Sequence, residues 1–284
     1  MISPIWIFSF LCLFVCGCTH TDGSFVQKSG FISLSPAITE TIYALNGEEM
    51  LIGRSDYCLF PQEAKRLPSF GTALTPNLEQ IAQQNPAGLL FDGAFGTPKE
   101  ELSALSAVHV YPWLTSSDMV SSITQLGVLL NKETKAQEIA QEIQRVFATT
   151  SDDSAQSMIA LMSGSDIDSG VFWFMRADSL HGEAVEAAGF RNVAPSDIQG
   201  PPSMSAEELL ARNPDVILLI CSPEVDEKTA QQLVQKLSKF TTLTAVQKNR
   251  VGYIIGENRM GIGPTIVDLV QEIKRKGSLL LDVQ

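Results

Sequence analysis

The stretch KETKAQEIAQEIQRVFAT, residues 132–149, predicts the element around which the chain is organised. Its apolar side chains recur at helical spacing and form one narrow stripe, while charged side chains occupy the other faces. The stripe consists of Ala136, Ile139, Ala140, Ile143, Val146 and Phe147. We therefore expect a solvent-exposed helix that lies along another part of the fold.

A related phrase occurs once before this helix and once after it. Residues 77–86 read NLEQIAQQNP, residues 205–214 read SAEELLARNP, and a short apolar run follows each phrase. In both, Asn-Pro stands six and seven residues after a glutamate. Because proline cannot continue a helix and disfavours helical conformation in the preceding residue, each phrase predicts a helix, a stop and a buried strand. One such unit on each side of a long helix predicts two similar lobes joined by a rigid connector.

The strand and helix patterns alternate with short loops on both sides of this connector. Such alternation is typical of parallel sheets covered by helices. The expected fold class is α/β, with two pseudo-symmetric lobes of parallel-rich sheets joined by a single long connecting helix. The expected parts are an N-terminal α/β lobe at residues 31–115, a connecting helical segment at 116–150 and a C-terminal α/β lobe at 151–284.

The composition is that of a globular protein with an acidic balance. The 284 residues are 44% hydrophobic and 18% charged, and the formal net charge is -12. A surface that binds nucleic acid needs clustered Lys and Arg, and the sequence contains no basic run of that kind. Nucleic acid is therefore excluded as a partner.

The first residues predict export. Residues 1–17, MISPIWIFSFLCLFVCG, contain no charged side chain, and the apolar run is short for a membrane span but typical of a signal peptide. Val15-Cys16-Gly17-Cys18 resembles a bacterial lipobox, which implies cleavage before Cys18, a lipid on its sulfur and attachment to a membrane. The alternative is a short anchor that is never cleaved. Either way the globular part is extracytoplasmic, periplasmic or at the cell surface, and residues 18–30 form a flexible lipidated tether.

Two of the five cysteines lie in the body of the chain, Cys58 in the first half and Cys221 in the second. A disulfide between them would bridge the lobes in an oxidising compartment. Spacing alone cannot establish the close approach that a disulfide needs, so two separate buried thiols are the expectation and the bond is the alternative.

Several segments together resemble the substrate-binding lipoproteins of ABC importers for vitamin B12 and ferric siderophores. They lie in order over nearly all of residues 31–276, and they are ISLSPAITE at 32–40, SDY at 55–57 with Pro61, FGT at 70–72, PNLEQI at 76–81, AGFRNV at 188–193, EELLARNP at 207–214 and GPTIV at 263–267. The resemblance implies a monomeric binding protein, not an enzyme, with its ligand held between two lobes. It also implies an ABC permease dimer and its ATPase as partners. No catalytic residue, metal site or resident cofactor is expected, because the cargo itself carries the cobalt or iron.

The resemblance gives Glu79 and Glu207 a shared role. They match the pair of glutamates, one on each lobe, that docks into arginine pockets of the permease, and two carboxylates at matching places suit a two-fold symmetric partner. The alternative is that each is only an acidic residue in the first turn of a helix, where the helix dipole stabilises it by about 0.3–1 kcal/mol. Both roles are compatible.

Loops at the carboxyl ends of parallel strands supply the candidate ligand-binding residues. These are Ser35, Arg54, Tyr57 and Phe70 on the first lobe and Trp173, Arg176, Glu257 and Arg259 on the second. Aromatic rings offer flat apolar area to a macrocycle, and arginine holds a carboxylate or phosphate through paired hydrogen bonds. Phe172 and Phe174, spaced two apart, are expected in the core instead.

Ligand identity stays open between a corrinoid and a ferric siderophore. The SDY loop followed by Pro61 resembles corrinoid binders, which ranks a corrinoid slightly ahead, whereas three candidate arginines suit an anionic siderophore. The enzymatic alternative is a chelatase-like protein acting on tetrapyrroles, which would need His181 and a carboxylate. A third alternative, direct binding of a divalent metal, is disfavoured because the chain has only three histidines. Of these, His109 lies within a predicted strand, where a structural role is expected.

Overall fold

Four short parallel strands form the sheet of the N-terminal lobe. They are β1 (Phe31–Ser33), β2 (Leu51–Arg54), β3 (Gly88–Phe91) and β4 (Val108–Val110), in the order β2-β1-β3-β4. The structure, a computed structural model, describes residues 30–93, 96–149, 151–152, 154–196, 198 and 200–282. The predicted signal peptide and the predicted lipid attachment at Cys18 lie outside the described residues.

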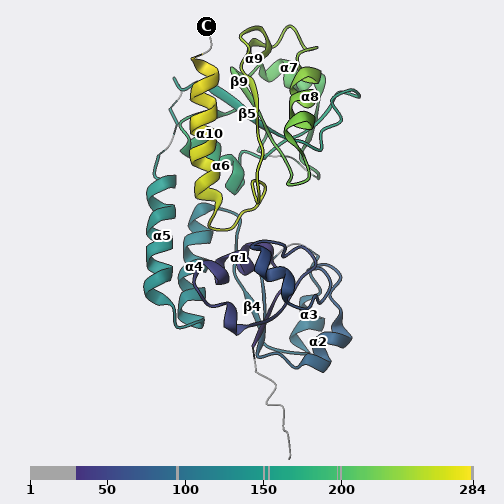
Figure 1. Cartoon of the computed structure of the whole chain (residues 1–284), viewed down its shortest axis with the longest axis vertical. Helices are drawn as coiled ribbons and strands as arrows, with labels where there is room; N and C mark the ends of the chain where they lie inside the picture. Colours follow the sequence, from purple (N-terminus) through teal and green to yellow (C-terminus); the bar gives the residue numbers. More distant parts are fainter. Residues whose placement is uncertain are drawn as a thin grey trace, which may run out of the picture.

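Four further parallel strands form the sheet of the C-terminal lobe. They are β5 (Ser157–Met162), β7 (Arg191–Asn192), β9 (Val216–Ile220) and β10 (Val251–Ile254), in the order β10-β9-β5-β7. In both sheets the strand that comes second along the chain lies at an edge, beside the first, and the third and fourth follow. The two sheets therefore share one topology, which confirms the predicted α/β class with two similar lobes (Figure 1).

A small antiparallel pair accompanies the C-terminal sheet. It consists of β6 (Val171–Trp173) and β8 (Ser203–Ser205), and a bridge between Leu161 and Phe174 links it to β5. Phe172 and Phe174 are fully buried, which confirms their predicted place in the core.

The two copies of the repeated phrase fold into matching units. Helix α2 (Leu78–Gln84) leads into β3, and α7 (Ala206–Arg212) leads into β9, the third strand of the other sheet. The side chains of Asn77 and Ser205 cap the two helices by accepting a hydrogen bond from the backbone three residues on. Both helices end at an asparagine in the left-handed conformation, Asn85 with φ 49° and Asn213 with φ 40°, which confirms the predicted stop before proline.

Two antiparallel helices occupy the segment between the lobes. Helix α4 (Ser116–Leu129) packs against α5 (Glu133–Phe147), and both run along one side of the molecule (Figure 1). Thr115 and Asp118 form a capping box at the start of α4. The predicted apolar stripe of α5 faces inward, with Ala136, Ala140 and Ile143 buried.

The two lobes share one hydrophobic core. Its largest cluster contains Ile42 of the N-terminal lobe, Ile143 of α5 and Leu218 of the C-terminal lobe, and each lobe adds a cluster on the other face of its sheet. The remaining helices are α1 (Pro36–Ala44), α3 (Lys99–Ser103), α6 (Leu180–Ala187), α8 (Glu227–Leu237), α9 (Thr244–Gln247) and α10 (Ile266–Leu281), with short 3-10 turns at Glu48–Met50 and Gln62–Arg66. In the described part of the chain, no helix has both the length and the apolar character to cross a bilayer.

Candidate ligand cleft between the lobes

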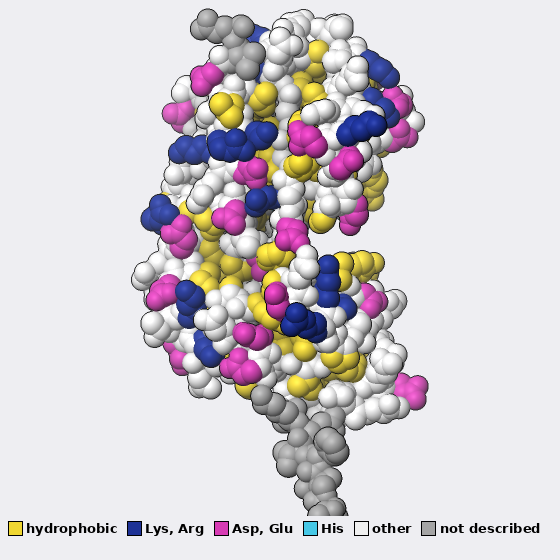
Figure 2. Space-filling view, in the orientation of Figure 1, with side chains coloured by type: hydrophobic (Ala, Val, Ile, Leu, Met, Phe, Trp, Pro, Cys, Tyr) yellow, Lys and Arg dark blue, Asp and Glu magenta, His cyan; other side chains and the backbone are white. Residues whose placement is uncertain are grey.

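A cavity of about 470 Å³ lies between the lobes. The molecule is visibly hollowed there, on the side away from α4 and α5 (Figure 2). The N-terminal lobe lines the cavity with Pro36, Ala37, Glu40, Tyr57, Leu59, Phe60 and Lys65. The C-terminal lobe lines it with Pro223, Glu224, Glu257, Asn258, Met260, Gly261 and Ile262. These residues follow β1, β2, β9 and β10, so the cavity sits where open α/β sheets bind ligands, at the carboxyl ends of strands.

A second cavity of about 500 Å³ adjoins the first at Ile262, which lines both. Its other lining residues lie at or just after the ends of β3 and β4 and are Asp92, Gly93, Val110, Pro112, Trp113 and Leu114. The buried indole of Trp113 donates from Nε1 to the carbonyl oxygen of Ile262 over 2.6 Å, a hydrogen bond from one lobe to the other. Together the two cavities, called the cleft below, form a broad surface made by both lobes.

A buried carboxylate closes the base of the cleft. Glu40 of α1 is 5% exposed and accepts three hydrogen bonds from the loop before α10, from Asn258 Nδ2 over 2.6 Å, the Thr265 backbone over 2.8 Å and Thr265 Oγ1 over 2.7 Å. Burial raises the pKa of Glu40 against the lowering effect of these donors. Gly263 is required beside it, because a Cβ there would lie 2.2 Å from Glu40 Cδ. These residues, Glu40, Asn258, Gly263 and Thr265, are called the latch below.

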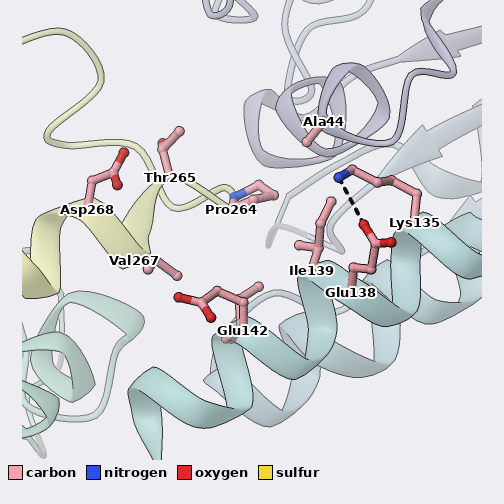
Figure 3. A pocket seen from close by; sticks show the side chains of 10 residues that line it. Ala44, Lys135, Glu138, Ile139, Glu142, Pro264, Thr265, Val267 and Asp268 are labelled. Carbon is pink, nitrogen blue, oxygen red and sulfur yellow. Dashed lines mark hydrogen bonds and ion pairs between the residues drawn. The ribbon is translucent and has the colours of Figure 1, made fainter.

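A third pocket, of about 430 Å³, lies behind the latch (Figure 3). Helix α5 lines it with Lys135, Glu138 and Ile139, and the start of α10 adds Thr265 and Asp268. Lys135 and Glu138 form an ion pair with a 3.1 Å separation on this wall. Since Glu40 lines the cleft and Thr265 lines the pocket, the latch forms part of the wall between them.

Of the eight predicted ligand residues, the structure brings Tyr57 and Glu257 onto the cleft lining. Tyr57 is 68% exposed, so its ring is open to the cleft. Glu257 accepts a 2.8 Å hydrogen bond from the side-chain amide of Gln62, which joins the two lobes at the cleft.

The three predicted arginines lie outside the residues that line the cleft, and each is held by neighbouring acceptors. Arg176 forms a forked pair with Asp178, with contacts of 2.8 and 2.5 Å. Arg259 is paired with Glu272 of α10 over 3.0 Å. Arg54 donates to the carbonyl oxygen of Ser55, its neighbour, over 2.7 Å. A role for these three in holding an anionic ligand stays a prediction.

The other three predicted residues serve the fold where the structure places them. Ser35 is 1% exposed and donates to the carboxylate of Asp92, and Phe70 is 4% exposed and packs in the N-terminal core. A Cβ at Gly53 would lie 2.3 Å from the Phe70 ring, so this glycine makes room for it. Trp173 lies on β6, where its backbone N–H donates to Ser165 Oγ. Contact of any of them with ligand stays a prediction.

The two repeat glutamates lie at equivalent exposed positions. Glu79 and Glu207 each occupy the second residue of their helix, two after the capping residue. In α7 the capping box uses the neighbouring Glu208, so Glu207 is not needed for the cap. Glu79 has a local contact of 3.2 Å with Gln83, one turn further along α2. Both carboxylates are therefore accessible to a partner.

The two histidines and two cysteines that the structure describes have structural surroundings. Burial lowers the pKa of His181 to about 4, and the ring contacts the backbone of Met260. His109 packs edge-on against Phe31 and stacks on Tyr111. Cys58 and Cys221 are both free and fully buried, which confirms the expectation of two separate thiols. Within the ranges that the structure describes, no group of three His, Cys, Asp or Glu side chains is placed to hold a metal ion.

Comparison with known proteins decides the family. Residues 32–257 match the family model described as periplasmic binding protein, which covers both lobes and the helices between them. The chain belongs to the periplasmic binding protein family. The latch residues Asn258, Gly263 and Thr265 and the whole of α10 lie beyond the matched range, although Asn258 and Thr265 bind Glu40 within it and α10 packs on its core.

Relatives of this periplasmic binding protein include two with named cargo. It is 30% identical over 227 residues to the vitamin B12-binding protein of Pectobacterium carotovorum, covering 77% of this chain and 80% of the relative. It is 24% identical over 258 residues to the high-affinity heme uptake system protein IsdE of Staphylococcus aureus, with 86% of each covered. The crystal structure of the periplasmic vitamin B12 binding protein of Vibrio cholerae has the same fold, with a TM-score of 0.71, 19% identity and coverage of 89% of this chain and 98% of that one.

Sequence reasoning missed the latch and the contact of Trp113 with Ile262, which join the lobes in this periplasmic binding protein. Glu40 and Asn258 stand 218 positions apart, and Trp113 and Ile262 stand 149 apart, so no local pattern connects them. The available signal was chemical, since Glu40 interrupts an otherwise uncharged helix, and Gly261 and Gly263 mark a place of close backbone approach.

Proposed function

We propose that this chain is the extracytoplasmic substrate-binding protein of an ABC importer. It would capture a bulky metal chelate between its lobes and deliver it to a permease dimer driven by its ATPase. The observation that carries the proposal is the cleft itself, a pair of adjoining cavities at the carboxyl ends of strands from both lobes. Named relatives that bind vitamin B12 or take up heme support the same class of cargo.

A corrinoid is the first candidate for the cargo and a ferric siderophore the second. The relative with 30% identity is named a vitamin B12-binding protein, which supports this order. The exposed ring of Tyr57 and the exposed aliphatic side chain of Leu59 would pack on the flat apolar faces of such a ligand. We expect binding at these side chains to be mainly apolar.

Calorimetric titration of the protein with cyanocobalamin, hemin and a panel of ferric siderophores tests the proposal. Leu59 lines the cleft and is 50% exposed, whereas Leu279 on α10 is 54% exposed and lines neither cavity. Leu59→Ala should weaken binding of the true cargo by about tenfold, the cost of losing roughly 1.5 kcal/mol of apolar burial. Leu279→Ala, the matched control, should leave affinity unchanged. If no chelate binds, the proposal is wrong.

Delivery is proposed to depend on Glu79 and Glu207. Their equivalent exposed positions on two lobes of one topology suit a two-fold symmetric permease. Reversing both charges with lysine should abolish cargo uptake in cells that carry the importer while ligand affinity stays the same. Reversal of Glu100 and Glu133, two exposed glutamates elsewhere, controls for net charge. Normal uptake by the double variant would refute the docking role.

Membrane attachment through a lipid on Cys18 is part of the proposal. It rests on the apolar run of residues 1–17 and the lipobox-like sequence that ends at Cys18. Mass spectrometry of the membrane-bound protein should find residue 18 as the lipid-modified N-terminus, and a Cys18→Ser variant should lose the lipid. An intact residue 1 on the membrane-bound protein would support the uncleaved anchor instead.

A further inference from the structure

The charged groups on the cleft lining are mostly carboxyls. Glu40, Glu224, Glu257 and Asp92 line the two cavities, whereas Lys65 is the one cationic side chain among the described residues that do so. Glu224 and Glu257 are exposed and face the open space between the lobes. A negatively charged ligand entering the cleft would therefore meet more like charges than opposite charges.

Two of the arginines that could have offset this excess are paired with carboxylates elsewhere. Arg176 is held by both oxygens of Asp178 and by the carbonyl oxygen of Ser196, at 3.2 Å. The Arg259 side chain is 25% exposed and its partner Glu272 is 20% exposed, so this ion pair is largely shielded. Moving Arg259 to a ligand would leave the shielded Glu272 with only a 3.6 Å contact to Arg275, and moving Arg176 would give up both of its bonds to Asp178.

The uncharged part of the lining is strongly apolar. Eight large hydrophobic side chains are exposed in the described part of the chain, and three of them, Tyr57, Leu59 and Leu114, line the cleft. Exposed apolar groups gathered in a concave site indicate a ligand with a hydrophobic surface of its own. Apolar contact can therefore supply the affinity for a ligand, and the carboxyl groups can discriminate between ligands of different charge.

We infer that the cleft selects metal chelates of zero or positive net charge and discriminates against polyanionic chelates, an inference that rests on the proposed function. A corrin with amide side chains or a ferric tris-hydroxamate meets this description. A ferric tris-catecholate, with net charge of about -3 from three dianionic catecholates on Fe³⁺, does not, and neither does a porphyrin with free propionates. Like charges in the cleft repel such ligands, and this repulsion weakens as salt is added.

Pairs of ligands that share a core and differ in charge test the inference on the full-length protein. One pair is ferrioxamine B, which is cationic, and its N-succinyl derivative, which is anionic. The other is cyanocobalamin, which is neutral, and its monocarboxylic acids, which are anionic. In the pair whose core is the cargo, the less negative member should bind on the order of tenfold more tightly at low salt, and the difference should narrow as salt rises.

Matched variants place the discrimination in the cleft. The double variant Glu224→Gln/Glu257→Gln should reduce the difference in affinity between the two members of a ligand pair several-fold. The control Glu101→Gln/Glu133→Gln removes two exposed carboxylates outside the cleft lining and should leave the difference unchanged. The control variant should also leave the affinity for the less negative member of each pair within about twofold.

The outcomes separate this inference from the proposed function. Equal or tighter binding of the anionic members, in competition with the other member of the pair, overturns the charge selection while the binding function stands. A reduced difference in the control variant also overturns it, because the effect would then come from net charge. Binding of no ligand in the panel overturns the proposed function and the inference with it.

Discussion

Replacing Glu40 with alanine tests whether the latch holds the two lobes together. The substitution removes three hydrogen bonds to Asn258 and Thr265, all of 2.8 Å or shorter. Hydrogen bonds to a charged group contribute about 1.5–3 kcal/mol each, but the desolvation of the Glu40 carboxylate offsets much of that sum. The donors left behind cost about 1–3 kcal/mol each when buried, and the adjacent cleft lets water reach some of them. We expect a net loss of about 2–4 kcal/mol in the free energy of unfolding.

Thermal unfolding followed by circular dichroism measures this loss. For a chain of this size about 2 °C is lost per kcal/mol, so Glu40→Ala should lower Tm by about 4–8 °C. Glu101→Gln, an exposed glutamate of the same lobe, should leave Tm unchanged. A Tm within about 1 °C of the unmodified protein would refute the idea that the latch stabilises the contact between the lobes.

The isosteric variant Glu40→Gln adds a pH test with a definite sign. Burial raises the pKa of Glu40 above its ordinary value of 4.5, so the folded protein binds this proton more tightly than the unfolded chain does. The proton-linked part of the Glu40 contribution to stability is therefore full below pH 4.5 and is lost as pH rises through the folded-state pKa. The stability of the unmodified protein relative to Glu40→Gln should fall over this window. A relative gain with rising pH would show that the donors outweigh desolvation.

Three further predictions concern the rest of the molecule. Gly127→Ala should lower Tm, because the new Cβ would lie 2.3 Å from the Cβ of Ala136 on α5. This clash should outweigh the helix propensity of alanine, which exceeds that of glycine by about 1 kcal/mol. A higher Tm would contradict the close packing of α4 on α5. Cys58 and Cys221 should be unreactive toward Ellman's reagent in the native protein and should appear as two additional reactive thiols on unfolding. The reason is that burial raises the pKa of both thiols, that of Cys221 to about 11. Rapid labelling of these two cysteines in the native protein would contradict their burial. Solution scattering should change little on ligand binding because the lobes share a core, and a large change would refute a rigid connection.

The parts of the fold that could be predicted are those with a local cause. The match between the two lobes follows from the repeated phrases, because capping residues and the Asn-Pro stops at Asn85 and Asn213 act within a few positions of the helices that they end. The face that α5 buries also follows from spacing alone. The spacing of apolar residues does not reveal which element a helix packs against, so the packing of α4 on α5 is seen only in the structure.

The candidate site was less predictable because its residues are selected by long-range contacts. The loop argument named Tyr57 and Glu257, which line the cleft, yet the same argument also named Phe70, whose ring packs in the core beside Gly53. Arg176 could have been recognised as paired, since Asp178 is only two residues away. Arg259 could not, because Glu272 comes within reach only once α10 has folded against the loop before it.

The latch connects rigidity with recognition. Glu40 lines the cleft and binds the loop that carries Asn258 and Thr265, and this same loop supplies Met260 and Ile262 to the cleft lining. A ligand that displaced this loop would have to break hydrogen bonds to a buried carboxylate, which costs more than breaking exposed ones. The loop therefore presents its apolar side chains at nearly fixed positions. Ligand selectivity must then come from the shape and charge of a largely preformed surface. Single substitutions of cleft-lining residues therefore test ligand selectivity more directly than substitutions between the lobes would.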